Sequence, residues 1–159
     1  VIATYKYDHQ AKMALELGAD AVIQSSDEGI RDKIMKSADG TGIDAIVETT
    51  ASADGFNLAM SVIRKGGSLV LVGGYHKALE VNLSRIVGGE IRVTGSSCYG
   101  YSGMKRDFEW SMDFIMSNKI PAGKLITNRV PLSNIEEAFK IAADKNSGSI
   151  KVLVYNDYS

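Results

Sequence analysis

Short apolar runs alternate along this chain with segments whose apolar residues recur at helical spacing. The apolar runs, typical of strands buried on both faces, are residues 1–5, 21–23, 43–47, 68–72 and 91–95. In the segment 8–17, Met13, Ala14 and Leu17 share one helical face, and Gly18 follows as a helix stop. Strands that alternate with helices predict an α/β fold with a mainly parallel sheet covered by helices.

Polar residues at helix starts refine this prediction. Ser25 or Ser26 is expected to cap the helix that contains Ile30 and Ile34, because serine side chains accept hydrogen bonds from the first free N–H groups. Ser52 or Asp54 should begin a helix that runs to residue 63. Its expected inward-facing residues are Phe56, Ala59, Met60 and Ile63.

Glycines and apolar spacing organise the next part of the chain. Residues 65–67, Lys-Gly-Gly, are expected to turn the chain into the strand 68–72, and residues 81–87 should be helical in part. A longer helix is predicted over 104–117, with Trp110 on its flank. Four apolar residues at helical spacing mark this helix: Phe108, Met112, Ile115 and Met116.

The main break in organisation lies around Pro121. Beyond it the pattern predicts a strand over 125–130, a helix capped by Ser133 with Glu136 at capping-box spacing, and a strand over 150–155. The C-terminal part is therefore a strand, helix and strand appended to the main sheet.

Composition excludes several classes of function. With 159 residues, 45% of them hydrophobic, the chain can bury a core, and its net charge of −1 with scattered basic residues argues against nucleic acid as a partner. No apolar run approaches the roughly 20 residues of a membrane span, so we expect a cytoplasmic protein that does not bind membranes. The lone Cys98 and two distant histidines offer no metal-ligand spacing, so no metal site is expected in this chain.

The chain begins with Val1 and a strand, and no glycine-rich phosphate loop precedes that strand. A strand, helix, glycine and second strand are how a dinucleotide-binding sheet continues after its first βα unit. We therefore expect part of a longer protein, with a Rossmann-like doubly wound sheet entered at its second strand.

Five segments, in order and spacing, resemble the C-terminal half of the medium-chain dehydrogenase/reductase family, the zinc-type alcohol, threonine and polyol dehydrogenases. The segments are LGADAVI at 17–23, GIDAIVE at 42–48, RKGGSLVLVG at 64–73, VPLSNIEEAF at 130–139 and IKV at 150–152. The resemblance implies a partial dinucleotide-binding domain over 1–121, and a segment 122–159 that returns to a catalytic domain outside the chain.

The resemblance also implies an activity. The parent enzyme would transfer hydride between NAD or NADP and a small alcohol, polyol or carbonyl compound, with zinc held by residues outside this chain. The chain itself would have no catalytic residue and would be inactive alone. Because the family's subunits associate through the edge of this sheet, residues 81–94 are the expected surface of a homo-oligomer.

In doubly wound sheets, ligands bind beyond the carboxyl ends of the strands. That rule selects the candidate cofactor-binding residues Tyr5, Lys6, Thr49, Thr50, Val72, Gly73, Gly74, Ser96 and Cys98. The resemblance places the first two near the adenosine ribose, the threonines near adenine and ribose, and the others near the nicotinamide carboxamide.

Several of these residues have a second interpretation. At the end of the first strand, Tyr5 replaces the usual acidic residue and Lys6 can pair with a ribose 2′-phosphate, which favours NADP(H). In the alternative interpretation, Tyr5 covers adenine, Lys6 is solvated and NAD(H) binds. Thr49 and Thr50 either donate to ribose or cap a helix. The Gly-Gly pair after residue 72 either lets backbone approach a ring or makes a tight turn.

The family's strand order places its first strand between residues 1–5 and 43–47. Three outcomes are open without it: residues 1–4 pair directly with 43–47, another chain fills the position, or upstream residues do so. We favour a rearranged or intermolecularly completed sheet. Two other classes stay open as well, a non-enzymatic nucleotide-sensing Rossmann domain and a methyltransferase-like α/β domain.

Overall fold

The computed structural model describes residues 1–157, which fall into two compact units. One unit is Glu28–Tyr101, and the other combines Val1–Asp27 with the chain from Ser102 onward. Each unit is described separately below.

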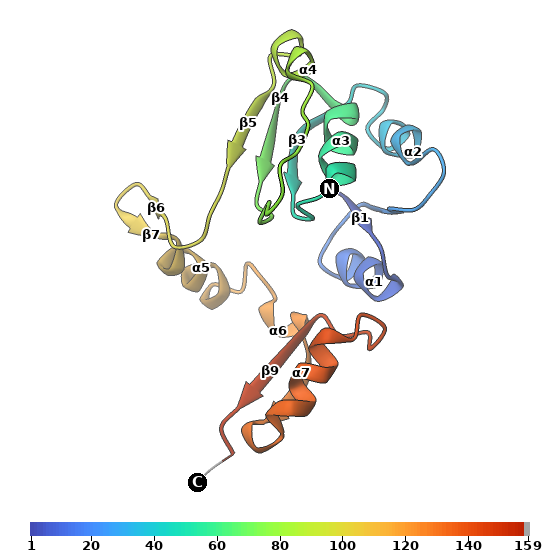
Figure 1. The fold of residues 1–159 in the computed structure, drawn as a ribbon. Helices are drawn as coiled ribbons and strands as arrows, with labels where there is room; N and C mark the ends of the chain where they lie inside the picture. Colours follow the sequence, from blue (N-terminus) through green and yellow to red (C-terminus); the bar gives the residue numbers. More distant parts are fainter. Residues whose placement is uncertain (158–159) are drawn as a thin grey trace. The chain divides into compact units, whose positions relative to one another are not determined.

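The unit Glu28–Tyr101 is built on a three-stranded parallel sheet in the order β3-β4-β5 (Figure 1). Its elements, in chain order, are α2 (Ile30–Ser37), β3 (Ile43–Glu48), α3 (Ala53–Val62), β4 (Ile63–Leu71), α4 (Leu83–Gly88) and β5 (Arg92–Gly95). Helix α3 packs against β3 and β4, and α2 packs against α3. Because all three strands are parallel, their carboxyl ends meet at one edge of the sheet.

The core of this unit lies between α3 and the central strand. Leu69 of β4 is completely buried, and it packs with five other buried residues: Phe56, Ala59, Met60, Ile63 and Ile91. The four inward-facing residues predicted for the helix 52–63 are therefore buried as expected. Ile86 of α4 is partly buried and also packs against this cluster.

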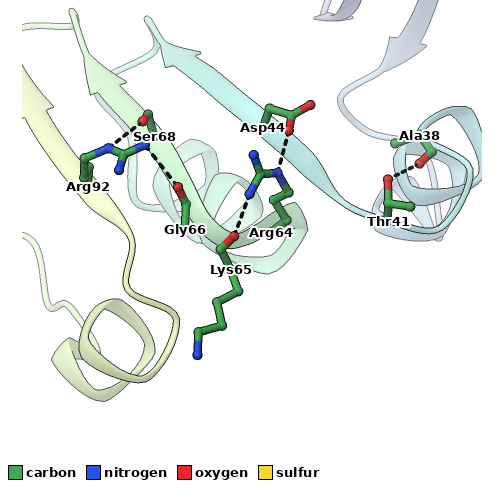
Figure 2. Close-up of polar contacts among 8 residues, drawn as sticks. All are labelled: Ala38, Thr41, Asp44, Arg64, Lys65, Gly66, Ser68 and Arg92. Atoms are coloured by element: carbon green, nitrogen blue, oxygen red, sulfur yellow. Dashed lines mark hydrogen bonds and ion pairs between the residues drawn. The ribbon is translucent and has the colours of Figure 1, made fainter.

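Arginines connect the three strands near their amino-terminal ends (Figure 2). Arg64 donates through Nε to Asp44 Oδ1 at 2.5 Å, which joins β4 to β3. Arg92 donates to Ser68 Oγ and to the Gly66 carbonyl oxygen, both at 3.2 Å, which joins β5 to β4. These contacts lie at the end of the sheet opposite the candidate site.

The other unit contains two separate parallel strand pairs. Its elements are β1 (Ile2–Tyr5), α1 (Asp8–Glu16), β2 (Ala21–Gln24), α5 (Asp107–Met116), α6 (Ala122–Leu125), β8 (Ile126–Pro131), the 3-10 helix η1 (Leu132–Asn134), α7 (Ile135–Ala143) and β9 (Lys151–Tyr155). Strand β1 pairs with β2, against which α1 packs, and β8 pairs with β9, against which α7 packs. Two-residue strands β6 (Tyr101–Ser102) and β7 (Lys105–Arg106) form a short ribbon at the start of this part.

The predicted fold class is confirmed. Parallel strands alternate with helices, and a strand, helix and strand follow at the C-terminal end. Among residues 1–157, no helix is both long enough and apolar enough to cross a bilayer.

Strand β4 differs from the prediction at its start. It begins at Ile63, directly after α3, and passes through the Lys-Gly-Gly segment that was expected to be a preceding turn. Gly66 adopts a φ of +72°, and the pairing with β3 shifts register between Ile43 and Ala45. The turn prediction was wrong because Ile63 already pairs with Ile43, so the glycines form an irregularity within the strand.

Two predicted helix caps are also wrong. Helix α2 begins after Gly29 rather than after Ser25 or Ser26. Helix α7 begins after Asn134, and the Ser133 hydroxyl instead donates to Asp157 at 2.6 Å. In both places a serine that could cap the helix is present, but the helix begins after a later residue.

The helix predicted over 104–117 is present as α5, Asp107–Met116, and it has no buried residue. The four apolar residues whose spacing predicted it are 41% to 76% exposed: Phe108, Met112, Ile115 and Met116. The spacing therefore predicted the helix correctly, and the face that these residues form is partly exposed.

Within the part of the chain that the structure describes, β1 is hydrogen-bonded to β2, and β3 is hydrogen-bonded to β4. Because β1 and β3 belong to different units, all three outcomes for the missing first strand stay predictions.

Replacing Leu69 by alanine should destabilise the protein strongly, because the side chain is completely buried at the centre of the core. Leu69→Ala is expected to lower the free energy of unfolding by about 2–5 kcal/mol. Leu83→Ala, at a position that is 66% exposed, is the matched control and should change it by less than about 0.5 kcal/mol. Urea denaturation followed by circular dichroism measures both, and equal effects would contradict this description of the core.

Candidate functional site

The carboxyl ends of β3 and β4 bring two loops into contact, here called the paired turns: residues 49–52 after β3 and residues 72–75 after β4. The backbone N–H groups of Val72 and Gly73 both donate to the Glu48 carbonyl oxygen, at 2.9 and 3.3 Å. Five predicted site residues therefore lie in the paired turns: Thr49 and Thr50 in the first, and Val72, Gly73 and Gly74 in the second.

The predicted residues after β5 are positioned less firmly. The Ser96 N–H donates to the Leu71 carbonyl oxygen at 2.9 Å, so Ser96 continues the edge beside the second turn. Cys98 has an exposed free thiol, and no hydrogen bond within the described residues joins it to the paired turns. The structure thus groups Ser96 with the turns but does not group Cys98 with them.

Tyr5 and Lys6 end strand β1 in the other unit, so their geometry stands by itself. Tyr5 is half-buried and Lys6 is exposed. The N–H groups of Lys6 and Tyr7 each donate to Gln10 Oε1 at 3.1 Å, and the Lys6 ammonium lies 5.6 Å from the centre of the Tyr7 ring. The lysine charge is therefore available at a strand end whose backbone is held by the following helix.

Gly73 is required by contact between the paired turns. A Cβ at this position would lie 2.7 Å from the Ala51 nitrogen and 2.8 Å from its Cβ. A Cβ at Gly74 would lie 3.3 Å from His76 Nε2, a much looser restriction. Of the two interpretations of the Gly-Gly pair, the tight turn is sufficient to explain Gly73.

A buried carboxylate joins the paired turns. Glu48 ends β3 and is only 4% exposed, and it is the one charged side chain in the core of the described residues. Its Oε1 accepts hydrogen bonds from the Thr50 N–H at 2.7 Å and from the Thr50 hydroxyl at 2.5 Å. Its Oε2 accepts from the Ala51 N–H at 3.1 Å and from the Tyr75 hydroxyl.

Neither this role of Glu48 nor the part played by Tyr75 was predicted from the sequence. One signal was present: an acidic residue directly continues the apolar strand 43–47. Such a carboxylate is costly to bury unless several donors surround it, so its donors were to be sought in nearby loops. Nothing in the sequence pattern identified Tyr75 as one of them.

Hydrogen bonding shifts the pKa of both partners. Burial alone would raise the pKa of Glu48, but the hydrogen bonds from Thr50, Tyr75 and Ala51 outweigh it and hold the pKa below its ordinary value. Burial, the hydrogen bond to Glu48 and the charge of that carboxylate raise the pKa of Tyr75 to about 12. At neutral pH the pair is therefore an ionised carboxylate and a protonated phenol.

The two threonine hydroxyls at this edge differ in whether they are already hydrogen-bonded. Thr49 is exposed, and its side chain makes no hydrogen bond with the rest of residues 1–157. The Thr50 hydroxyl is occupied, because it also lies 2.7 Å from the Ser52 hydroxyl. The edge thus offers an available hydroxyl on a turn with well-held backbone.

The described residues do not fit a zinc site. Across residues 1–157, no group of three or more His, Cys, Asp or Glu side chains is placed to hold a metal ion.

The chain was compared with known proteins. A model of the zinc-binding dehydrogenase family matches residues 1–117. An alcohol dehydrogenase of Cupriavidus necator is 27% identical over 156 residues, which are 97% of this chain and 42% of that protein. A sorbitol dehydrogenase of Bombyx mori is 28% identical over 159 residues, 98% of this chain and 43% of that protein.

Solved structures agree with these matches. A zinc-dependent alcohol dehydrogenase 2 from Streptococcus pneumonia, in its apo form, has a TM-score of 0.85 and 27% identity. The match covers 99% of this chain and 45% of that one. The chain thus spans about two fifths of the length of the curated relatives it matches.

The raised pKa of Tyr75 predicts a loss of stability in alkaline solution. In the unfolded chain the phenol ionises near pH 10, whereas in the folded protein it keeps its proton until about pH 12. The free energy of unfolding should therefore fall as the pH rises through this interval, and Tyr75→Phe should remove that part of the slope. Denaturation at pH 9 to 12 measures it, with Tyr155→Phe on β9 as the control; an unchanged slope in Tyr75→Phe would contradict the assignment.

Proposed function

Because the chain belongs to the zinc-binding dehydrogenase family, we propose that it forms the dinucleotide-binding part of an NAD(P)-dependent oxidoreductase. The best support is that the family match over residues 1–117 contains every candidate cofactor residue, from Tyr5 to Cys98. The paired turns supply the local geometry, since ligands of doubly wound sheets bind beyond the carboxyl ends of the strands.

In this proposal the whole protein transfers hydride between nicotinamide and a small alcohol, polyol or carbonyl compound. The bound dinucleotide supplies the hydride donor or acceptor. Residues 1–121 form the dinucleotide-binding domain, and residues 122–159 return to a catalytic domain. In this proposal, residues outside this chain hold the zinc, and the chain alone is inactive.

The residues of this chain bind and orient the cofactor. Tyr5 and Lys6 lie at the adenosine ribose, and the paired turns approach the rest of the dinucleotide with Ser96 beside them. The exposed ammonium of Lys6 favours NADP(H), because it can pair with the ribose 2′-phosphate and Tyr5 stands in place of the usual acidic residue at the end of β1.

Cofactor titration tests both the function and the preference. The full-length protein should bind NADPH more tightly than NADH, measured by nucleotide fluorescence. Lys6→Gln should weaken NADPH binding by roughly fivefold, about 1 kcal/mol, and leave NADH binding unchanged. Lys12→Gln, an exposed lysine on α1, is the matched control.

Each result of the titration has a clear consequence. Tighter binding of NADH would overturn the preference for NADP(H) while leaving the oxidoreductase proposal in place. Absence of binding to either nucleotide would overturn the proposed function. Binding without oxidation of any alcohol would favour the nucleotide-sensing alternative.

We also propose that two copies associate through residues 81–94. Strand β5 is the last strand of its sheet among the described residues, and all of its residues, Arg92–Gly95, are exposed. An exposed strand edge is a ready surface for pairing with another strand.

A charge on this strand should prevent association. Val93 is 37% exposed, and Val93→Asp would place a carboxylate in the proposed interface. Sedimentation equilibrium should show a dimer or larger oligomer for the natural protein and a monomer for the variant, with unchanged circular dichroism. An unchanged mass for Val93→Asp would exclude this surface.

A further inference from the structure

The Glu48 carboxylate has no free capacity for a ligand. It accepts four hydrogen bonds, two at each oxygen, all from residues of the paired turns. It is also buried to 4% exposure. Any effect of Glu48 on a bound cofactor must therefore act through the turns rather than by contact.

Those hydrogen bonds determine the shape of the first turn. Ala51 has a φ of +53°, in the left-handed region that is unfavourable for a residue with a side chain. Its N–H donates to Glu48 at 3.1 Å, and its backbone lies directly against Gly73 of the second turn. The carboxylate and the neighbouring turn thus hold a backbone conformation that is unfavourable by itself.

The same network makes the two threonines unequal. Both the N–H and the hydroxyl of Thr50 are bound by Glu48 Oε1, and a Cβ at Gly55 would lie only 2.7 Å from that oxygen, so the region is tightly filled. Thr49 and Thr50 are both exposed, but the Thr49 side chain has no hydrogen-bond partner within residues 1–157.

We infer that Glu48, together with Thr50 and Tyr75, is a positioning device that presents Thr49 as the hydroxyl that contacts the bound dinucleotide. This inference rests on the proposed function, because it assumes that the dinucleotide binds at this edge. It assigns different roles to two adjacent threonines: Thr49 contacts the ligand, and Thr50 is a positioning residue. It also makes Tyr75, in a loop with no other assigned role, a contributor to cofactor affinity.

The two threonines provide a matched experiment in the full-length protein. Thr49→Val should raise the dissociation constant for the preferred nucleotide roughly fivefold, the effect of one lost hydrogen bond, with an unchanged melting temperature of the unliganded protein. Thr50→Val should lower that melting temperature and also raise the dissociation constant. Thr50→Ser keeps the hydroxyl and should restore both.

Glu48→Gln and Tyr75→Phe test the positioning role directly. Both should raise the dissociation constant and the cofactor KM by roughly tenfold while kcat at saturating cofactor stays within about twofold, because the reacting atoms are not touched. Glu80→Gln, at an exposed glutamate, removes the same charge and should change neither quantity. All binding is measured at a temperature where circular dichroism shows each variant to be folded. Under that condition, a residue that only stabilises the fold would leave affinity unchanged when it is replaced.

The outcomes separate this inference from the proposed function. If the natural protein binds neither NADH nor NADPH, the proposed function fails. If the natural protein binds a nucleotide and Thr49→Val binds it equally well, the inference is overturned and the function stands. The inference is likewise overturned if folded Glu48→Gln and Tyr75→Phe retain full affinity.

Discussion

Parallel pairing of β3, β4 and β5 is the constraint on which the candidate site depends. It brings the carboxyl ends of all three strands to one edge, so residues separated by more than twenty positions in the chain become neighbours. The completely buried Leu69 packs the central strand β4 into the core. Arg64 and Arg92 join the strands at the opposite end, where no ligand is expected.

A buried charge converts this edge from a set of strand ends into a defined geometry. Glu48 is tolerated in the core because four donors surround it, and those donors come from both turns beyond the strands. The hydrogen bonds that stabilise the Glu48 carboxylate can therefore form only while the two turns stay in contact. The cost of burying the carboxylate and the left-handed backbone of Ala51 are both offset by the same set of hydrogen bonds.

Helix α5 shows how far local pattern can be trusted. Its apolar spacing predicted a helix correctly, because spacing governs which residues share a face. Whether that face is buried depends on a partner surface, which the spacing does not record, and the four residues of the face are 41% to 76% exposed. Ser133 gives the same lesson at smaller scale, since its hydroxyl donates to Asp157, a residue far along the chain, instead of capping the nearby helix.

The sequence by itself determined the α/β alternation, the parallel strand pairs, the buried face of α3 and the family resemblance that the comparison with zinc-binding dehydrogenases confirmed. These features follow from periodicity and from short segments whose residues interact locally or pair strand with strand. Only the tertiary structure decided the roles around Glu48: the partnership with Tyr75, twenty-seven residues away, and the unequal environments of Thr49 and Thr50. The physical reason is that a hydrogen-bond network depends on which loops the sheet brings together, and no spacing along the chain records that proximity.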